Sequence, residues 1–296
     1  MNIEITRAKN ENKQAIIDLS HHFTEDYLDL VLDRWISQEK GGLYLAWDNH
    51  TLVGCCALYF PSPTEGWLQG MRIRPDCQGQ GIAYHLNANL IKLAAQEGAQ
   101  VVRLITSPHN YQALRLAEKL GFKVTGDHRE IVFRQPLNTG IKDDSSEKLP
   151  SPLLCNKEEK QEALKILSAG PAAHSGKGML FGPRFTFRKL TPSYLEQAID
   201  ENEVYLFFAD GKTSGVLVTI KQESESHLVC GYLNAPNHLL PSLFKLLPDW
   251  QVQGFQYFTF NMLQDQHLAL QPGLKKYFGQ YNYEKMLLME KPLNAD

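Results

Sequence analysis

Two glycines stand one residue apart in the stretch QGQGIA, residues 78–83, where an apolar segment gives way to a helical pattern. The N-terminus of a helix presents unpaired backbone N–H groups and a partial positive charge, and both stabilise a phosphate. Gly79 and Gly81 carry no side chain that would keep a phosphate away from those amides. A tight turn that needs room explains the same glycines, so the loop by itself leaves both interpretations open.

The spacing of this loop differs from two common phosphate-binding motifs. A P-loop requires Lys-Ser/Thr after its second glycine, and none follows Gly81. A dinucleotide-binding loop requires a third glycine at position 84, which is Tyr84 here. Any anion at this loop would therefore bind mainly to backbone amides.

The cysteines offer little chemistry of their own. Their number is five, and none has the spacing of a zinc site, so we expect no bound metal. Cys77 adjoins the glycine loop, where a helix N-terminus lowers a thiol pKa. No basic residue is evident beside it, and we expect Cys77 to serve in packing rather than catalysis.

The periodicity of residues 1–137 predicts an α/β fold with a mixed sheet. Ser107 and Pro108 resemble a helix start, and Gly121 resembles a helix end. The expected elements, in order, are a strand at 3–7, helices at 13–23 and 26–37, strands at 43–47, 51–60 and 67–73, a helix at 82–96, a strand at 101–106, a helix ending before 121, and one or two strands after it.

The second half of the chain repeats part of this order. Residues 138–155 are predicted to form a linker, and 156–296 show helix, three strands, helix, strand, helix, strand. This order indicates a degenerate internal duplication. The corresponding strand-to-helix junction, YLNAPNHLLP at 232–241, has no glycine pair, so we expect only the first half to bind an anion there.

Two motifs together resemble the GNAT superfamily of acyl-CoA-dependent N-acyltransferases. The family pattern is a strand ending in hydrophobic-x-Pro, then Gln/Arg-x-x-Gly-x-Gly/Ala, then a helix. Ile73-Arg74-Pro75 and the loop at 78–83 match it, and residues 110–122 match the second signature, an asparagine opening a helix that ends in Glu-Lys-Leu-Gly-Phe. The resemblance covers residues 3 to about 135.

The resemblance implies acetyl-CoA as co-substrate, held where the strands at 67–73 and 101–106 splay apart. The pantetheine arm would pair with the backbone of Met71, Arg72 and Ile73, and Asn110 would hydrogen-bond it. The pyrophosphate would bind the backbone amides of Gln78, Gly79, Gln80, Gly81, Ile82 and Ala83.

The expected catalytic acid of the family is missing. Many members carry a tyrosine just before Glu-Lys-Leu-Gly-Phe, where this chain has Ala117. Tyr111 is our candidate acid, with Tyr84, His109 or water as substitutes. Glu65 is our candidate base, with Glu130 as the alternative, although a surface carboxylate explains either one; Gln69 cannot serve as a base.

A weaker resemblance, to the histidine N-acetyltransferase family, concerns the acceptor. It rests on Asp26, Tyr27, Leu28 and Trp35 and on stretches such as GYLNA and YEKMLLME of the second half. It implies a free amino acid as the small-molecule amine acceptor, contacted by Asp26 and Tyr27, with Asn261 a further candidate. The alternatives are acetylation of a protein or peptide amine, and a CoA-binding sensor that no longer catalyses.

The composition of the chain limits the kinds of binding partner that we expect. The formal net charge is −3, which gives no reason to expect binding to nucleic acid or to an anionic membrane. No apolar stretch is long enough for a membrane span, and the first residues lack the apolar core of a secretory signal. We therefore expect a cytoplasmic protein with a large enough apolar content for a core in each half.

Overall fold

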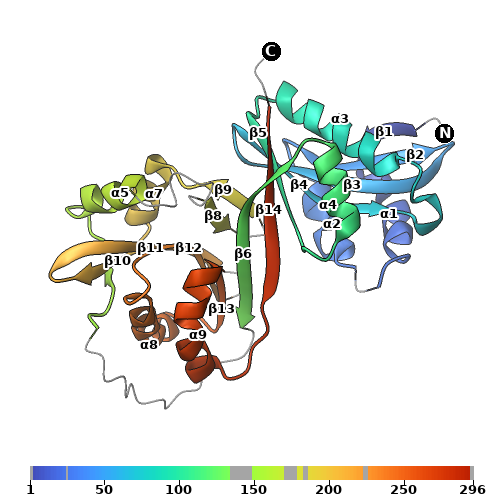
Figure 1. Ribbon diagram of the computed structural model, residues 1–296. Helices are drawn as coiled ribbons and strands as arrows, with labels where there is room; N and C mark the ends of the chain where they lie inside the picture. Colours follow the sequence, from blue (N-terminus) through green and yellow to red (C-terminus); the bar gives the residue numbers. More distant parts are fainter. Residues whose placement is uncertain are drawn as a thin grey trace. The chain divides into compact units, whose positions relative to one another are not determined.

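The computed structural model describes residues 3–24, 26–133, 149–169, 179–182, 186–222 and 226–293. The chain forms two compact units (Figure 1). Unit 1 comprises Met1–Val124 together with Leu288–Asp296, and unit 2 comprises Thr125–Leu287. Most of the predicted linker at 138–155 lies outside the described residues.

Unit 1 contains a mixed sheet, as predicted. Its strands, in spatial order, are β1 (Ile3–Arg7), β2 (Gly42–Asp48), β3 (Thr51–Ser62), β4 (Glu65–Ile73), β5 (Val101–Thr106) and the end of β14 (Glu284–Pro292). Neighbours from β1 to β4 run antiparallel, whereas β4 and β5 run parallel.

Helices cover both faces of this sheet, and the sequence of β3 explains why. Cys55 and Ala57 pack with α1 (Lys13–Ser20) and α2 (Leu28–Ile36) in one core cluster. Cys56 and Leu58, which alternate with them along the strand, point to the other face. There they pack in a second core cluster with residues of α3 (Ile82–Gln96) and α4 (Tyr111–Lys119). A strand buried on both faces reads as a continuous apolar run, which is what TLVGCCALYF shows. The five cysteines are buried and unbridged.

The start of α4 differs from the cap expected at Ser107 and agrees with the second signature, in which an asparagine opens the helix. The N-cap is Asn110, whose Oδ1 accepts a hydrogen bond from the backbone N–H of Ala113 at 3.1 Å. Ser107 instead closes the preceding turn, where its Oγ accepts from the N–H of His109 at 3.2 Å. Both residue types suit a cap, and Asn110 takes the role because the turn at 107–110 precedes the helix.

The strands of unit 2 have a related order. In spatial order they are β6 (Lys123–Phe133), β13 (Tyr257–Leu263), β12 (His227–Asn234), β11 (Lys212–Gln222), β10 (Val204–Ala209) and β7 (Leu153–Leu154). β10, β11 and β12 are antiparallel neighbours, and β12 and β13 are parallel. The strands β2 to β5 of unit 1 show the same succession of pairings.

The remaining elements of unit 2 pack on these strands. They are α5 (Lys160–Ala169), the hairpin of β8 (Met179–Gly182) and β9 (Thr186–Lys189), α7 (Pro192–Asp200), the 3-10 helix η5 (Leu240–Leu246), α8 (Leu247–Val252) and α9 (Gln264–Phe278). The single helix predicted over 238–247 is thus a 3-10 helix that continues into a short α-helix. Pro241 lies in the first turn of η5, where its missing N–H costs no hydrogen bond.

The last strand changes unit along its length. From Leu288 onward it belongs to unit 1, where Met289 is fully buried and the Leu293 N–H donates to the carbonyl of Gln100 at 2.8 Å. Glu290 accepts from Arg103 on β5 at 2.8 Å. In the first half, β6 passes into unit 2 after Val124. The compact units therefore have other bounds than the segments 1–137 and 156–296 expected from the sequence.

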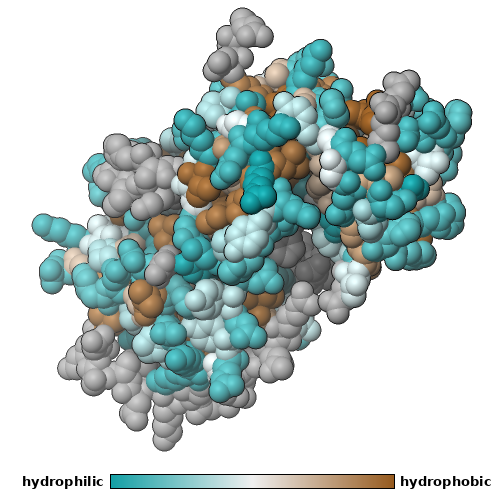
Figure 2. All heavy atoms as spheres, turned by 45° about the vertical axis from the view of Figure 1, so that its right-hand side comes forward, coloured by the Kyte–Doolittle hydropathy of each residue, from teal (hydrophilic) through white to brown (hydrophobic). Residues whose placement is uncertain are grey.

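Hydrophilic side chains occupy most of the face drawn in Figure 2, with smaller hydrophobic patches between them. Among the described residues, no helix is both long and apolar enough to cross a membrane. Within the same residues, no group of three or more His, Cys, Asp or Glu side chains could hold a metal ion.

Candidate active site

β4 and β5 separate after a short stretch of pairing. Glu65, Gly66 and Trp67 pair with Val101, Val102 and Arg103, whereas the rest of β4 follows β3 alone. The main-chain N–H and C=O groups on the β5 side of Met71 to Ile73 are therefore outside this parallel ladder. Such groups bind other polar partners, and an amide-bearing ligand supplies them.

A bulge in β4 accompanies this separation. The register between β3 and β4 shifts between Cys55 and Ala57, and Gly70 there has a φ of +67°. A Cβ on Gly70 would lie 2.5 Å from the ring of Trp35, so α2 packs directly on the β4 backbone. This role of Gly70 was not predicted from the sequence, although a lone glycine within a strand pattern is a signal for a bulge or a close approach.

The glycine loop has the backbone that an anion site needs. Gly79 and Gly81 have φ values of +76° and +83°, a region that other residues seldom adopt. The first hydrogen bond of α3 runs from the N–H of His85 to the carbonyl of Gly81 at 3.0 Å, so the preceding amides are directed out of the helix. An added Cβ would meet nothing within 4 Å at Gly79, and only the His85 ring, at 3.8 Å, at Gly81.

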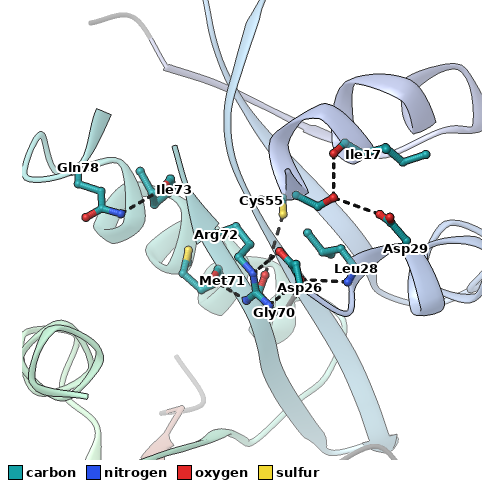
Figure 3. A network of polar contacts seen from close by, with 11 residues as sticks. Ile17, Asp26, Leu28, Asp29, Cys55, Gly70, Met71, Arg72, Ile73 and Gln78 are labelled. Atoms are coloured by element: carbon teal, nitrogen blue, oxygen red, sulfur yellow. Dashed lines mark hydrogen bonds and ion pairs between the residues drawn. The ribbon is translucent and has the colours of Figure 1, made fainter. Parts of the chain in front are cut away.

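The two glutamines of the loop brace it. Gln78 donates from Nε2 to the carbonyl of Ile73 at 3.3 Å, as Figure 3 shows, and Gln80 donates to the carbonyl of Asp76 at 3.3 Å. Their side chains thereby fix the loop to the end of β4 and to the turn before it. Cys77, in that turn, is buried in the core cluster of α3, in line with a packing role.

Asp26 and Arg72 form a two-pronged ion pair (Figure 3). Arg72 Nε lies 2.9 Å from Asp26 Oδ2, and Nη2 lies 2.9 Å from Oδ1. Asp26 Oδ1 also accepts from the N–H of Leu28 at 3.0 Å, which connects the pair to the start of α2. The Asp26 side chain is 4% exposed and that of Arg72 17%. Asp26, expected to contact the acceptor, is therefore bound to Arg72 on β4, the strand expected to hold the cofactor.

Tyr27 lies beside this pair. Its ring is 5.0 Å from the Arg72 guanidinium and packs edge-on against Trp35. Burial raises the pKa of the Tyr27 phenol, against the opposing effect of Arg72, so the hydroxyl stays protonated at neutral pH. Tyr27 is nevertheless 43% exposed, which leaves it accessible to a ligand.

The candidate residues at α4 differ in their exposure to solvent. Tyr111 is the first residue of the helix and is 67% exposed. Ala117 faces inward and is fully buried, so the position where a tyrosine was expected belongs to the core. The structure gives Asn110 a capping role for its Oδ1, while its Nδ2 retains donor capacity.

Glu65 is placed far from the glycine loop. It opens β4, and the nine residues of that strand span roughly 25 Å at 3.3 Å per residue. Its carboxylate is buried, bonds to Arg103 and accepts from Ser62 at 2.9 Å. This engaged position does not favour Glu65 as a base for chemistry at the other end of the strand. Glu130, the alternative, lies in unit 2 opposite Asn261.

Unit 2 contains the same divergence of parallel strands, but one of its own side chains fills it. β12 and β13 pair from His227 to Cys230 and then separate. Gln266 on α9 bridges them: its Nε2 donates to the carbonyl of Leu233 at 2.6 Å, and its Oε1 accepts from the N–H of Leu263 at 2.9 Å. The side-chain amide of Gln266 therefore bonds to main-chain groups of unit 2 whose counterparts in unit 1 remain outside the ladder.

Comparison of the sequence with known families gives a match in the first half of the chain. The profile described as Acetyltransferase (GNAT) family matches residues 11–122. The spore coat polysaccharide biosynthesis protein SpsD of Bacillus subtilis is 30% identical over 127 residues, which make up 37% of this chain and 43% of that protein. The match thus spans less than half the length of this curated relative.

Solved structures resemble nearly the whole chain. A GCN5-related N-acetyltransferase from Sphaerobacter thermophilus has a TM-score of 0.59 at 12% identity, covering 98% of this chain and 95% of its own. An acetyltransferase candidate from Thermoplasma acidophilum has a TM-score of 0.52 at 15% identity, covering 97% and 92%. At these identities the likeness concerns the fold, and the mixed sheet flanked by helices is that of the GNAT acetyltransferases.

Proposed function

Because residues 11–122 match the GNAT acetyltransferase family and the chain has its fold, we propose that this protein transfers an acetyl group from acetyl-CoA to the amine of a small molecule. The observation that carries the proposal is the loop at 78–83. Its two left-handed glycines leave the N-terminus of α3 open to an anion.

The residues present fit the cofactor. The amides of 78–83 would hold the pyrophosphate, and the free side of β4 at Met71, Arg72 and Ile73 would pair with the pantetheine amides. Asn110 Nδ2 would donate to the same arm. In unit 2, Gln266 already fills the corresponding divergence, which supports one cofactor site per chain and the interpretation of the second half as a degenerate copy.

The chemistry requires a neutral amine, a polarised thioester carbonyl and a proton for the leaving thiolate. Bound acetyl-CoA would supply the activated acetyl group. Backbone N–H groups of β4 at 71–73 would polarise its carbonyl. Tyr111, at the start of α4 beside Asn110, is the candidate proton donor, since Ala117 provides none. Glu65 is engaged elsewhere, so Glu130 and water remain as the candidate bases.

For the acceptor, we propose a free amino acid. The support is the resemblance of residues 26–35 to the histidine N-acetyltransferase family and the position of Tyr27, exposed beside Arg72 at the end of β4. Asp26 then acts by holding Arg72 and α2, because both of its oxygens accept from Arg72. The relative SpsD is a spore coat polysaccharide biosynthesis protein, which makes an amino sugar the second acceptor class. The cytoplasmic location remains a prediction.

The test is the release of CoA thiol from acetyl-CoA in the presence of amino acids, amino sugars, polyamines or peptides. Turnover with free amino acids above the other classes supports the proposal. Preference for peptides would indicate protein or peptide acetylation. Measurable CoA binding without turnover on any acceptor would favour a sensor and would contradict the enzyme.

A further inference from the structure

One face of the sheet in unit 2 carries a buried row of polar side chains, His128, Glu130 and Asn261. β6 and β13 pair antiparallel, with Glu130 opposite Asn261 and His128 opposite Leu263, so the three project from one face. Neighbouring residues such as Ile131 and Phe260 project from the other face into the core. The row is almost inaccessible to solvent, with 4%, 5% and 5% exposure.

Two atoms of the row lack a hydrogen-bond partner among the described residues. His128 Nδ1 lies 3.0 Å from Asn261 Oδ1, but His128 Nε2 and Asn261 Nδ2 are buried and unpaired. An amide oxygen only accepts, so Nδ1 carries the proton and Nε2 presents a lone pair. If the amide is turned over, the roles exchange, and the pair still offers one donor and one acceptor. Burying both unpaired groups is costly.

The ionisable groups of the row can accommodate a cation. Burial raises the pKa of Glu130 to about 8, and the neighbouring Glu284 carboxylate acts in the same direction. Burial also lowers the pKa of His128 to about 4, so this imidazole is neutral at pH 7. A carboxyl group in such a setting ionises readily when a positive charge is placed beside it. The Phe187 ring, 4.5 Å from that of His128, provides an apolar neighbour.

We propose that the row of His128, Glu130 and Asn261 binds a small molecule in which a protonated primary amine stands next to a carbonyl or carboxylate oxygen. The ammonium donates to the Glu130 carboxylate and to His128 Nε2, and the oxygen accepts from Asn261 Nδ2. Such a ligand satisfies both unpaired atoms and also supplies the positive charge that lets Glu130 ionise. A resident water would bridge the two atoms but would leave Glu130 protonated. The three residues belong to unit 2, whereas the glycine loop belongs to unit 1.

The experiment is calorimetric titration of the full chain, without CoA, using glycinamide, ethylamine and acetamide as probes. Glycinamide is expected to bind saturably and to release a proton, because it ionises Glu130. Ethylamine lacks the oxygen and is expected to bind about tenfold more weakly. Acetamide lacks the charge and is expected not to bind. The Glu130→Gln variant should weaken glycinamide binding about tenfold or more, and Asn261→Ser should abolish the preference for glycinamide over ethylamine.

His267→Phe is the matched control. His267 is equally buried in unit 2 but lies on α9, which packs on the other face, and it bonds to the Tyr281 hydroxyl at 3.0 Å. This variant should bind glycinamide as the wild type does, and thermal melting checks that each variant is folded. Absence of saturable binding by every probe would mean a resident water only and would overturn the proposal. Unchanged glycinamide affinity in folded Glu130→Gln would overturn it as well.

Discussion

Arg72 on β4 holds Asp26, 46 residues earlier in the chain, through two hydrogen bonds of 2.9 Å. Arg72 Nη1 also donates to the carbonyl of Met71 at 3.0 Å, and the Tyr27 ring lies beside the guanidinium. The pair therefore fixes the segment before α2 against the part of β4 that we propose to hold the cofactor. Its contribution to stability can be separated from its contribution to binding.

We expect Asp26→Asn to destabilise the protein by about 3 kcal/mol, because it leaves a largely buried guanidinium without its counter-charge. Urea unfolding measures this loss. The matched control is Asp76→Asn, which breaks the neighbouring pair of Arg74 and Asp76, whose Asp76 side chain is 67% exposed. An exposed pair is screened by solvent, so its loss should be much smaller than that of Asp26→Asn. Equal losses in the two variants would contradict the structural role of Asp26.

The second prediction concerns the anion site. Gly81→Ala should weaken CoA binding about tenfold or more, because its Cβ would project into the open space over the helix N-terminus. Calorimetric titration with CoA measures the affinity. Gly211→Ala, in the turn between β10 and β11, is the control, since Gly211 also has a positive φ and nothing within 4 Å of an added Cβ. Both variants share a strain of about 1 kcal/mol. If both bind CoA alike, the pyrophosphate is elsewhere.

The third prediction concerns Gln266, which bridges β12 and β13 where the two strands separate. Gln266→Ala should cost about 2 kcal/mol of unfolding free energy, because Leu233 O and Leu263 N–H both lose a partner. It should not create a second cofactor site, since the junction at Ala235, Pro236 and Asn237 has no glycine pair. Titration should still give one CoA per chain. A stoichiometry of two in this variant would show that Gln266 alone closes the site.

Local patterns in the sequence predicted most of the fold. The glycine loop and α3 followed from residues adjacent in the chain. So did the hairpin between β2 and β3, where Asn49 and His50 both adopt positive φ as a two-residue turn requires. Asn156 and Glu159, whose spacing is typical of a capping box, form two reciprocal hydrogen bonds of 3.0 and 3.1 Å.

Features that depend on distant pairing were not predicted. Nothing local to the sequence of β14 indicates that Glu290 meets Arg103, 187 residues away, because strand partners are chosen by the whole fold. The same limit applies to Arg72 with Asp26, to Gly70 beneath Trp35, and to Gln266. The candidate base Glu65 illustrates the consequence, since its type suited catalysis but its partner Arg103 was not visible in the sequence.

The last prediction concerns pH and Glu130. Its pKa is about 8 in the folded protein and near 4.5 when unfolded, so the folded state holds one proton more between these values. The stabilisation is complete below pH 4.5 and is lost as the pH rises towards 8, by at most about 1.4 kcal/mol per pH unit. Glu130→Gln lacks this titration, while the opposite contribution of His128, from its pKa of about 4, is common to both proteins. Urea unfolding at pH 5, 6, 7 and 8 should therefore show the wild type losing stability relative to Glu130→Gln as pH increases. Parallel curves would mean that Glu130 is ionised in the folded protein and that a cation within unit 2 already pairs with it.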